Sequence, residues 1–489
     1  MPQTILWYDL ETFGRNSKYD RIAQFAALRT DYELRPVEEP IMLYCRLSPD
    51  YLPDPQACLV TGITPEIVQR NGMSERDFAA AVHVELSRPG TCITGYNNIR
   101  FDDEFIRNLF YRNFFDPYSW HYANGNSRWD LINVVRLAHD LRPQGINWPQ
   151  NDEGKTIFKL DQLTSSNGIE HSGAHDALAD VYATIEMARL IRNTNPKLYQ
   201  FAWDHRSRDQ VRRLLNLETR RPVLHTEWIY TRAAGCTTAV APVGVNPENP
   251  KAIIVADLRY DPTPILELSA DEIRKRIFTS SEILAPEQRI HISEIHQNRC
   301  PLITPMNVLD EESARKLEID IELCTERARM LYRNPLLIQK FQQVYGSRPA
   351  RPLPEDPELM IYGGGPFGGF FTDEDKPMFE QIRHCPTEKL HTIDIQSHDR
   401  RIPDLFRRYR WRNATDSLTT QERDRWFAFC AKRLLQPPES SAYTMETYEK
   451  KIKQLWESPN IDTRTTVILK ALKDYGAYLN SHILHYQAN

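Results

Sequence analysis

Apolar and polar residues alternate over short stretches in the first part of the chain, as in a fold that mixes strands and helices. Short β-prone runs predict strands over residues 4–11, 22–30, 41–46 and 91–96, and the first three follow one another closely enough to form a meander. Apolar positions at helical spacing predict helices from residue 65, from 102 to about 113, and over 130–140, 160–167 and 176–192. The pattern predicts an α/β domain over residues 1–192.

The pattern changes after a polar boundary at residues 192–197. An arginine-rich helix is predicted over 197–215, and β-prone runs follow at 227–231, 237–240 and 252–258, separated by segments rich in Pro, Gly and Asn such as 242–250. We therefore expect a small β-barrel or sandwich domain over residues 197–350. A proline-rich linker covers 348–357, and helical stretches from 373 onward predict an all-helical domain over 353–489.

The composition narrows the class of protein. The 489 residues are 41% hydrophobic and 26% charged, as in soluble globular proteins of two or three domains. No apolar run approaches the ~18 residues of a membrane span, and no secretory signal is recognisable, so a cytoplasmic location without membrane contact is expected. The eight cysteines form no CxxC pair, which argues against a zinc site and favours reduced thiols. The net charge of −5 argues against nucleic-acid binding through bulk positive charge, so such binding needs a local basic groove or metal ions.

Asp9 and Glu11 are the first candidates for chemistry. Side chains alternate along a strand, so both carboxylates project from one face and Leu10 from the other. Two close carboxylates repel each other unless a cation lies between them, and Mg²⁺ prefers such oxygen ligands. The same Asp-x-Glu spacing recurs at residues 102, 310, 320 and 356, where solvated charges are the simplest explanation. Only the pair at 9 and 11 directly follows an apolar run, Ile5-Leu-Trp-Tyr8.

Asp102, His175 and Asp180 extend this pattern. Asp102 follows a predicted strand and a Gly-Tyr-Asn-Asn turn, although an acid that stabilises the first turn of a helix is an alternative. His175 and Asp180 are five residues apart, so they cannot share a face of one helix. We expect His175 in the preceding loop, free to act as a general base, and Asp180 one turn into the helix; a lone surface or capping histidine is the alternative. Four carboxylates and an imidazole are the groups that two-metal phosphodiester hydrolysis needs.

These residues and their surroundings resemble a known family. Asp-x-Glu in a first strand, a later Asp and then His-x4-Asp resemble the DEDDh exonucleases. Longer segments resemble the bacterial exonuclease I family: Trp7-Tyr-Asp-Leu-Glu-Thr-Phe-Gly14, Leu59-Val-Thr-Gly-Ile-Thr-Pro65, Gly95-Tyr-Asn-Asn-Ile-Arg-Phe-Asp-Asp-Glu104 and Asn126-Ser-Arg-Trp-Asp130. The motifs nearly fill the first domain; beyond it the similarity weakens, but the length and the three-part layout persist.

The resemblance implies a ribonuclease H-like α/β exonuclease domain, an SH3-like β-barrel domain and an all-helical C-terminal domain. It implies a single-strand-specific 3′→5′ exodeoxyribonuclease that releases 5′-mononucleotides and acts in DNA repair and recombination. Asp9, Glu11, Asp102 and Asp180 would hold two Mg²⁺ ions, for which Mn²⁺ could substitute. Glu11 would also lie near the 3′ end, and His175 would deprotonate the attacking water. The implied partners are single-stranded DNA and the acidic C-terminal tail of single-stranded DNA-binding protein, and the enzyme is expected to be a processive monomer.

Cations and aromatic residues of the first domain are candidates for holding the DNA, because single strands are bound through their phosphates and by base stacking. The candidates are Arg107, Tyr118, Tyr122, Arg136 and Lys159, with Arg112 as a further cation. Lys159 stands where the family commonly has an arginine, and a lysine cannot form a bidentate phosphate contact. Packing in the core is the alternative for each aromatic residue.

Two further segments have simpler interpretations. The most basic stretch, residues 400–412, could contact DNA or an acidic partner, but a solvated helix face is favoured. Residues 363–368 satisfy the pattern GxGxxG, but no βαβ unit surrounds them, so a turn or flexible connection is favoured over a dinucleotide site.

Three other functions are alternatives to the exodeoxyribonuclease. A DEDDh ribonuclease is the nearest alternative, because the same metal chemistry cleaves both backbones, but the two additional domains argue against it. A non-catalytic nucleic-acid-binding factor is disfavoured because all five catalytic positions are intact. A nucleotide-dependent oxidoreductase depends only on the glycine pattern.

Overall fold

A computed structural model describes residues 3–171, 176–230, 235–280, 282–346, 352–363, 369–459, 461–484 and 486. The chain divides into two compact units. The first contains residues 1–127, 172–182 and 352–489, and the second contains residues 128–171 and 183–351. No helix within the described ranges is both long enough and apolar enough to cross a lipid bilayer.

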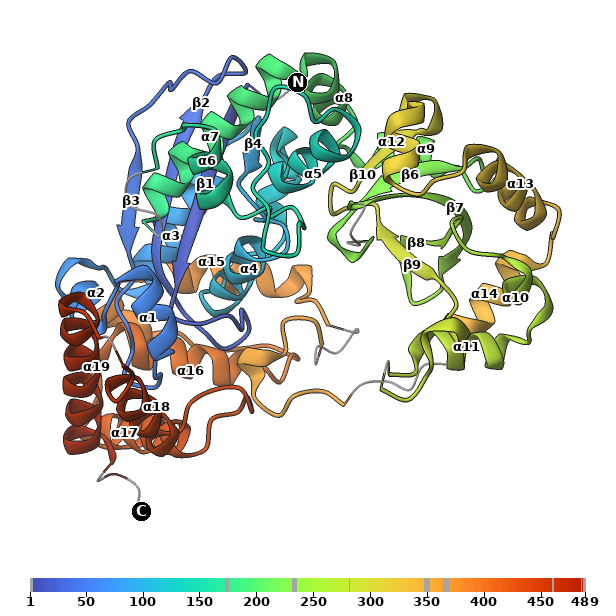
Figure 1. Cartoon of the computed structure of the whole chain (residues 1–489). Coiled ribbons are helices and arrows are strands. Elements are labelled where there is room, and N and C mark those ends of the chain that lie inside the picture. The colour runs from blue at the N-terminus through green and yellow to red at the C-terminus, as the bar shows by residue number, and fades with distance from the viewer. Residues whose placement is uncertain are drawn as a thin grey trace. The chain divides into compact units, whose positions relative to one another are not determined.

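A five-stranded sheet with the order β3-β2-β1-β4-β5 carries the first candidate residues (Figure 1). β1 (Thr4–Thr12) lies at its centre, antiparallel to β2 (Ile22–Thr30) and parallel to β4 (Thr91–Thr94). β3 (Ile41–Tyr44) pairs with β2, and β5 (Ser127–Arg128) ends the sheet. The predicted meander is confirmed, and all of β2 is buried, as expected for a strand inside a sheet covered on both faces.

Helices connect and flank these strands: α1 (Pro55–Thr61), α2 (Pro65–Asn71), α3 (Glu75–Leu86), α4 (Asp102–Arg112), α5 (Leu131–Leu141), α6 (Leu160–Ser166) and α7 (Ala177–Thr194), with short 3-10 turns at Ser119–His121 and Ala123–Gly125. α2 begins where the sequence predicts, because the Thr64 side chain accepts a hydrogen bond from the Ile67 N–H and Pro65 occupies the first turn. The predicted helices are confirmed; α1 and α3 were not predicted.

The second unit contains an antiparallel sheet with the order β10-β6-β7-β8-β9. Its strands are β6 (Val223–Thr226), β7 (Thr237–Asn246), β8 (Asn249–Asp257), β9 (Ile292–His296) and β10 (Leu302–Pro305). Its helices are α8 (Pro196–Asp204), α9 (Arg208–Leu214), α10 (Thr263–Glu267), α11 (Ala270–Phe278), α12 (Glu311–Lys316), α13 (Ile321–Tyr332) and α14 (Leu337–Gly346), with 3-10 turns at Trp228–Tyr230, Pro286–Gln288 and Met306–Val308. The predicted β domain is confirmed in having an antiparallel sheet, but it contains more helices than its β-prone runs predicted.

Three sequence predictions for this unit are wrong in detail. Within the predicted strand 227–231, residues 227–230 form no strand, because the Glu227 carbonyl accepts a hydrogen bond from the Tyr230 N–H and closes a 3-10 turn; residue 231 lies outside the described residues. The proline-containing segment after residue 240 does not end β7, since a register shift between Pro242 and Gly244 keeps it paired with β8. The predicted helix 197–215 is two helices, because Ser207 caps a new one.

The C-terminal part of the first unit is helical in its described residues, as predicted. It contains α15 (Lys376–His384), α16 (Ile402–Asn413), α17 (Thr420–Leu435), α18 (Met445–Trp456) and α19 (Thr463–His482), with 3-10 turns at Pro357–Leu359, Asp373–Asp375, Thr387–Thr392 and Thr415–Ser417. α19 packs against α1 and α2 (Figure 1). Residues 364–368 of the glycine pattern lie outside the described residues.

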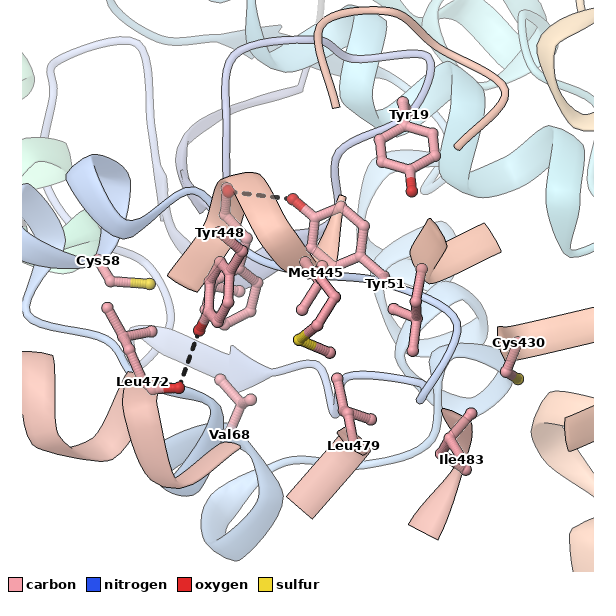
Figure 2. Packing of buried hydrophobic residues seen from close by; sticks show 14 of the residues in the cluster. Tyr19, Tyr51, Cys58, Val68, Cys430, Met445, Tyr448, Leu472, Leu479 and Ile483 are labelled. Atoms are coloured by element: carbon pink, nitrogen blue, oxygen red, sulfur yellow. Dashed lines mark hydrogen bonds between the residues drawn. The ribbon is translucent and has the colours of Figure 1, made fainter. Parts of the chain in front are cut away.

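One hydrophobic core joins residues from both ends of the chain. Tyr51 and Val68 of the N-terminal segment pack in the same buried cluster as Tyr448 and Leu479 of the C-terminal helices. Figure 2 shows the Tyr448 hydroxyl, which donates a hydrogen bond of 3.1 Å to the Leu472 carbonyl within this core. The helical domain is therefore part of the fold that carries the first strands.

The basic stretch 400–412 largely faces the interior, where it forms a buried ion-pair network. Arg412 lies 2.5 Å from Glu358 and 2.8 Å from Asp50, and Arg433 of α17 lies 2.8 Å from Glu358. Arg408 and Arg21 also belong to the network, at 3.7 and 3.6 Å from Glu358. Arg401 is also buried and forms an ion pair with Asp399. The interpretation as a solvated face is therefore wrong for Arg401, Arg408 and Arg412, whose charges are neutralised inside the protein.

Candidate active site

β1 presents Asp9 and Glu11 on one face of the sheet, as its alternation predicts. Asp9 pairs with Ala26 of β2, and Glu11 pairs with Gln24. Glu11 is buried and Asp9 is partly buried, while the intervening Leu10 packs in a hydrophobic core. Both acids are therefore fixed by a central strand whose other face is anchored in apolar contacts.

Two helix starts bring the other carboxylates to this strand. Asp102 is the first residue of α4, and its Oδ1 accepts a hydrogen bond of 3.2 Å from the Leu10 N–H. Asp180 lies in the first turn of α7, where its own N–H bonds to the Asp176 carbonyl at 3.0 Å. Oxygens of Asp9, Glu11 and Asp180 all lie within 4.8 Å of one another, so three acids share one small site.

The four acids form one electrostatic group, the acidic site. Burial raises the pKa of Asp9 well above its ordinary value, and the charges of Asp102 and Asp180 raise it further. Burial also raises the pKa of Glu11 to about 10, with further contributions from Asp9 and Asp180. Desolvated carboxylates at this spacing are costly to ionise together unless a cation shares them. The set of oxygen donors therefore fits a divalent metal ion.

Asp176 adds a fifth carboxylate that the sequence interpretation passed over. Its charge also raises the pKa of Glu11. Its side chain accepts a hydrogen bond of 3.0 Å from the Leu178 N–H at the start of α7. Its place beside His175 was the available signal; His175 itself lies outside the described residues, so its predicted role stays a prediction.

Two of the predicted DNA-binding residues belong to an aromatic and charged cluster of the first unit. Arg107 forms an ion pair with Glu104, and its guanidinium carbon lies 5.5 Å from the centre of the Tyr118 ring. The Tyr362 hydroxyl donates to the same Glu104 carboxylate. The Tyr118 ring centre lies 5.2 Å from that of Phe370. Arg107 is therefore held in place by a carboxylate of the same cluster.

Two aromatic rings, one in this cluster and one close to Tyr118 in the sequence, are exposed to solvent. Tyr122 is 62% exposed, and Phe370 is exposed to the same extent. The sequence interpretation missed Tyr362 and Phe370, because they flank a glycine-rich segment far along the chain from Tyr118. Exposed rings suit base stacking.

The remaining predicted cations differ in how accessible they are. Arg112 is buried against Glu75 at 2.8 Å, so it is a structural residue and not a surface cation. In the second unit, Arg136 is buried, donates to Asn133 at 2.8 Å and lies 3.9 Å from Glu227. Lys159 is exposed at the start of α6. Among these three, Lys159 presents the most accessible charge to a phosphate.

The raised pKa of Glu11 predicts a stability effect in the metal-free protein. Between the ordinary value of 4.5 and about 10, the folded protein holds a proton on Glu11 that the unfolded chain has lost. Its contribution to stability is therefore complete below pH 4.5 and is lost as the pH rises toward 10. We expect Glu11→Gln to flatten the fall of the melting temperature with rising pH in EDTA. Parallel pH curves for the two proteins would contradict this expectation.

Family models match the chain over three consecutive segments. Residues 6–188 match the family described as Exonuclease, residues 206–347 match the Exonuclease I SH3-like domain, and residues 355–479 match the Exonuclease I C-terminal domain. The expected fold class is thereby confirmed: a mixed-sheet exonuclease domain, an SH3-like domain with an antiparallel sheet and a helical C-terminal domain.

Characterised proteins are similar over nearly the whole length. Exodeoxyribonuclease I of Escherichia coli (strain K12) is 39% identical over 472 residues, which cover 96% of this chain and 97% of the relative. The structure of exonuclease I from Methylocaldum szegediense is 40% identical with a TM-score of 0.91, and the alignment covers 97% of this chain and 99% of that one. E. coli exonuclease I in complex with a dA16 oligonucleotide is 38% identical with a TM-score of 0.91, covering 98% and 100%.

Two further similar structures, the first of them of E. coli exonuclease I, contain ligands. One is a zinc-ion-bound form of its complex with single-stranded DNA, with a TM-score of 0.90 at 38% identity. The other is an SSB/exonuclease I structure in complex with the inhibitor CFAM, with a TM-score of 0.88 at 37% identity. Both alignments cover 98% of this chain and 100% of the other. The family models, the full-length relatives and these similar structures together show that the chain belongs to the exonuclease I family of 3′→5′ exodeoxyribonucleases.

Proposed function

We propose that this chain removes 5′-mononucleotides one after another from the 3′ end of single-stranded DNA, in DNA repair and recombination. The convergence of Asp9, Glu11 and Asp180 within 4.8 Å carries the proposal, because it supplies the acidic site that phosphodiester hydrolysis needs. Asp102 belongs to the same site through its effect on the pKa of Asp9. The DNA complex of the E. coli relative supports the choice of substrate.

We assign two Mg²⁺ ions to the acidic site, with Mn²⁺ as a substitute. Asp9, Glu11, Asp102 and Asp180 offer only oxygen donors, which both ions accept. When bound, the ions would supply positive charge to the attacking and leaving oxygens of an in-line displacement. The zinc-ion-bound form of the E. coli relative supports occupancy by a divalent ion in this family.

His175 is the proposed general base. It takes a proton from the attacking water onto a ring nitrogen, as an imidazole with a pKa near neutrality can. The water oxygen then bonds to phosphorus, and the 3′-oxygen of the preceding nucleotide leaves and takes up a proton from solvent, so that the terminal nucleotide departs with its 5′-phosphate. Glu11 is proposed to contact the 3′ end as well, from its position on β1.

The strand is proposed to be held by phosphate contacts and by stacking. Tyr118 and Tyr122 supply rings, and Arg107 supplies a charge that Glu104 holds in place. From the second unit, Lys159 and Arg136 are the proposed phosphate contacts. Lys159 keeps the charge of the more common arginine but not its bidentate geometry, so we expect its contribution to binding to be weaker.

We further propose a cytoplasmic, processive monomer of three domains over residues 1–192, 197–350 and 353–489. The family matches at 6–188, 206–347 and 355–479 fall within these bounds and support them. The eight cysteines, all free thiols, are consistent with a reducing compartment. The acidic C-terminal tail of single-stranded DNA-binding protein is the proposed protein partner, supported by the similar SSB/exonuclease I structure.

Release of label from matched substrates tests the proposal. Single-stranded DNA labelled at the 3′ or the 5′ end, duplex DNA and RNA are each incubated with Mg²⁺ or with EDTA. We expect early loss of the 3′ label as 5′-mononucleotides, only with Mg²⁺ and fastest on single-stranded DNA. A preference for RNA would favour a DEDDh ribonuclease, and tight DNA binding without cleavage would favour a non-catalytic binding factor.

A further inference from the structure

Gln24 lies in a row of side chains that crosses the first sheet. In the registers of the sheet, Glu11 of β1 pairs with Gln24 of β2, and Gln24 pairs with Tyr44 of β3. Directly paired residues on neighbouring strands project from the same face of a sheet. The Gln24 side chain therefore lies on the face that presents Glu11, and only 1% of the residue is exposed.

Both polar atoms of the Gln24 amide are bonded. Its Oε1 accepts a hydrogen bond of 3.3 Å from the Ala177 N–H, and its Nε2 donates one of 2.9 Å to the Tyr44 hydroxyl. These partners fix the orientation of the amide, because the Ala177 N–H can only donate. A buried amide is costly without its partners, so the two bonds together restrict where Ala177 can lie.

Ala177 is the first residue of α7, the helix that carries Asp180. The first N–H groups of a helix have no partner inside the helix. The Asp176 carboxylate satisfies the Leu178 N–H locally, whereas the Ala177 N–H is satisfied from the sheet. Gln24 thus connects the start of α7 to the strand beside Asp9 and Glu11, less than one helical turn before Asp180.

We propose that Gln24 is a positioning residue for the acidic site, which holds the start of α7 so that Asp180 completes the metal-binding set with Asp9 and Glu11. This inference rests on the proposed metal-dependent function. Gln24 contacts neither metal nor DNA in this proposal; it acts through the backbone of Ala177. Residues that orient metal ligands in this way typically change metal affinity or activity by about 10–100-fold when replaced.

Gln24→Met tests the proposal, because methionine keeps the length of the side chain and removes both hydrogen bonds. Mn²⁺ binding is measured without DNA from the electron paramagnetic resonance signal of the free ion. We expect Gln24→Met to bind Mn²⁺ about tenfold more weakly than the wild type. At subsaturating Mg²⁺ its kcat should fall while its KM for single-stranded DNA is unchanged. Unchanged Mn²⁺ affinity would overturn the proposal.

Thr30→Val is the matched control for a merely structural role. The Thr30 hydroxyl is buried on the same strand and accepts a hydrogen bond of 3.0 Å from Trp7 Nε1, at the other end of β2. We expect its loss to lower the melting temperature without weakening Mn²⁺ binding. Equal weakening of Mn²⁺ binding in both variants would show that general destabilisation, and not the position of α7, is responsible.

Tyr44→Phe keeps the proposal testable if Gln24→Met does not fold. It removes only the hydroxyl that accepts from the Gln24 amide, and we expect a smaller loss of Mn²⁺ affinity in the same direction. If Gln24→Met does not fold, unchanged Mn²⁺ affinity in a folded Tyr44→Phe variant would overturn the proposal. A wild type that binds Mn²⁺ but degrades no DNA would refute the proposed function while the Mn²⁺ comparison still decided the role of Gln24.

Discussion

Replacing Asp9 with asparagine is expected to lower the rate of mononucleotide release by roughly 10³-fold, equivalent to about 4 kcal/mol of transition-state stabilisation. Asp9 lies at the centre of the acidic site, since the charges of both Asp102 and Asp180 raise its pKa. Asparagine keeps the shape of the side chain but removes the charge that would bind a divalent ion. The rate is measured in single turnovers, from the loss of a 3′ label on single-stranded DNA with saturating Mg²⁺.

Asp320→Asn supplies the control, because Asp320 and Glu322 repeat the Asp-x-Glu spacing outside the acidic site. The Asp320 side chain caps α13 by accepting from the Leu323 N–H, and asparagine can accept the same bond. We expect this variant to retain the wild-type rate. An Asp9→Asn enzyme that keeps more than about a tenth of the wild-type rate would contradict the assignment of Asp9 as a metal ligand.

Replacing Glu358 with glutamine is expected to lower the free energy of unfolding by about 3–5 kcal/mol. Glu358 lies within ion-pair distance of Arg412, Arg433, Arg408 and Arg21 and is almost fully buried. The amide would leave these guanidinium groups close together with one compensating charge fewer. Urea unfolding followed by tryptophan fluorescence measures the loss, since Trp411 and Trp426 pack in the core of the same unit.

Asp404→Asn is the matched control, because it breaks an ion pair that lies at the surface of α16. Asp404 lies 2.7 Å from Arg407, whose side chain is 54% exposed. Exposed pairs contribute at most about 1 kcal/mol. Equal losses in Asp404→Asn and Glu358→Gln would show that burial of the network has no special effect.

The same network predicts how acid destabilises the protein. Burial alone would raise the pKa of Glu358, but Arg412, Arg433 and the other arginines outweigh it and hold the pKa well below the ordinary 4.5. This contribution to stability is present above pH 4.5 and is lost as the pH falls toward the lowered pKa. The wild type should therefore lose more stability on acidification than Glu358→Gln, and the difference between them should shrink at low pH.

The sequence predicted those features of the site that depend on residues close together in the chain. Asp9 and Glu11 follow from the alternation of a strand, and the start of α2 follows from Thr64 and Pro65. Asp102 had an equally good local explanation as a first-turn acid, so its role depended on the resemblance to a family. Local propensity failed at Glu227, where a turn hydrogen bond outweighs the β-prone composition.

Long-range contacts account for most of what the sequence did not predict. The arginines of residues 400–412 have the composition of a surface patch, and nothing near them in the chain reveals their burial. The partner of Arg412, Asp50, lies 362 residues away along the sequence. The capping of α7 by Gln24 was not predictable for the same reason, because it joins residues 153 positions apart.

The shared core of the chain ends bears on how the protein is made. Residues 1–127 belong to the same compact unit as residues 352–489, so the second unit is inserted into a fold that begins before it and finishes after it. During synthesis, Tyr51 and Val68 cannot pack with Tyr448 and Leu479 until the last helices have been made. A product of interrupted translation would expose the N-terminal residues of that core to chaperones and proteases. The first unit can therefore become stable only after the whole chain has been synthesised.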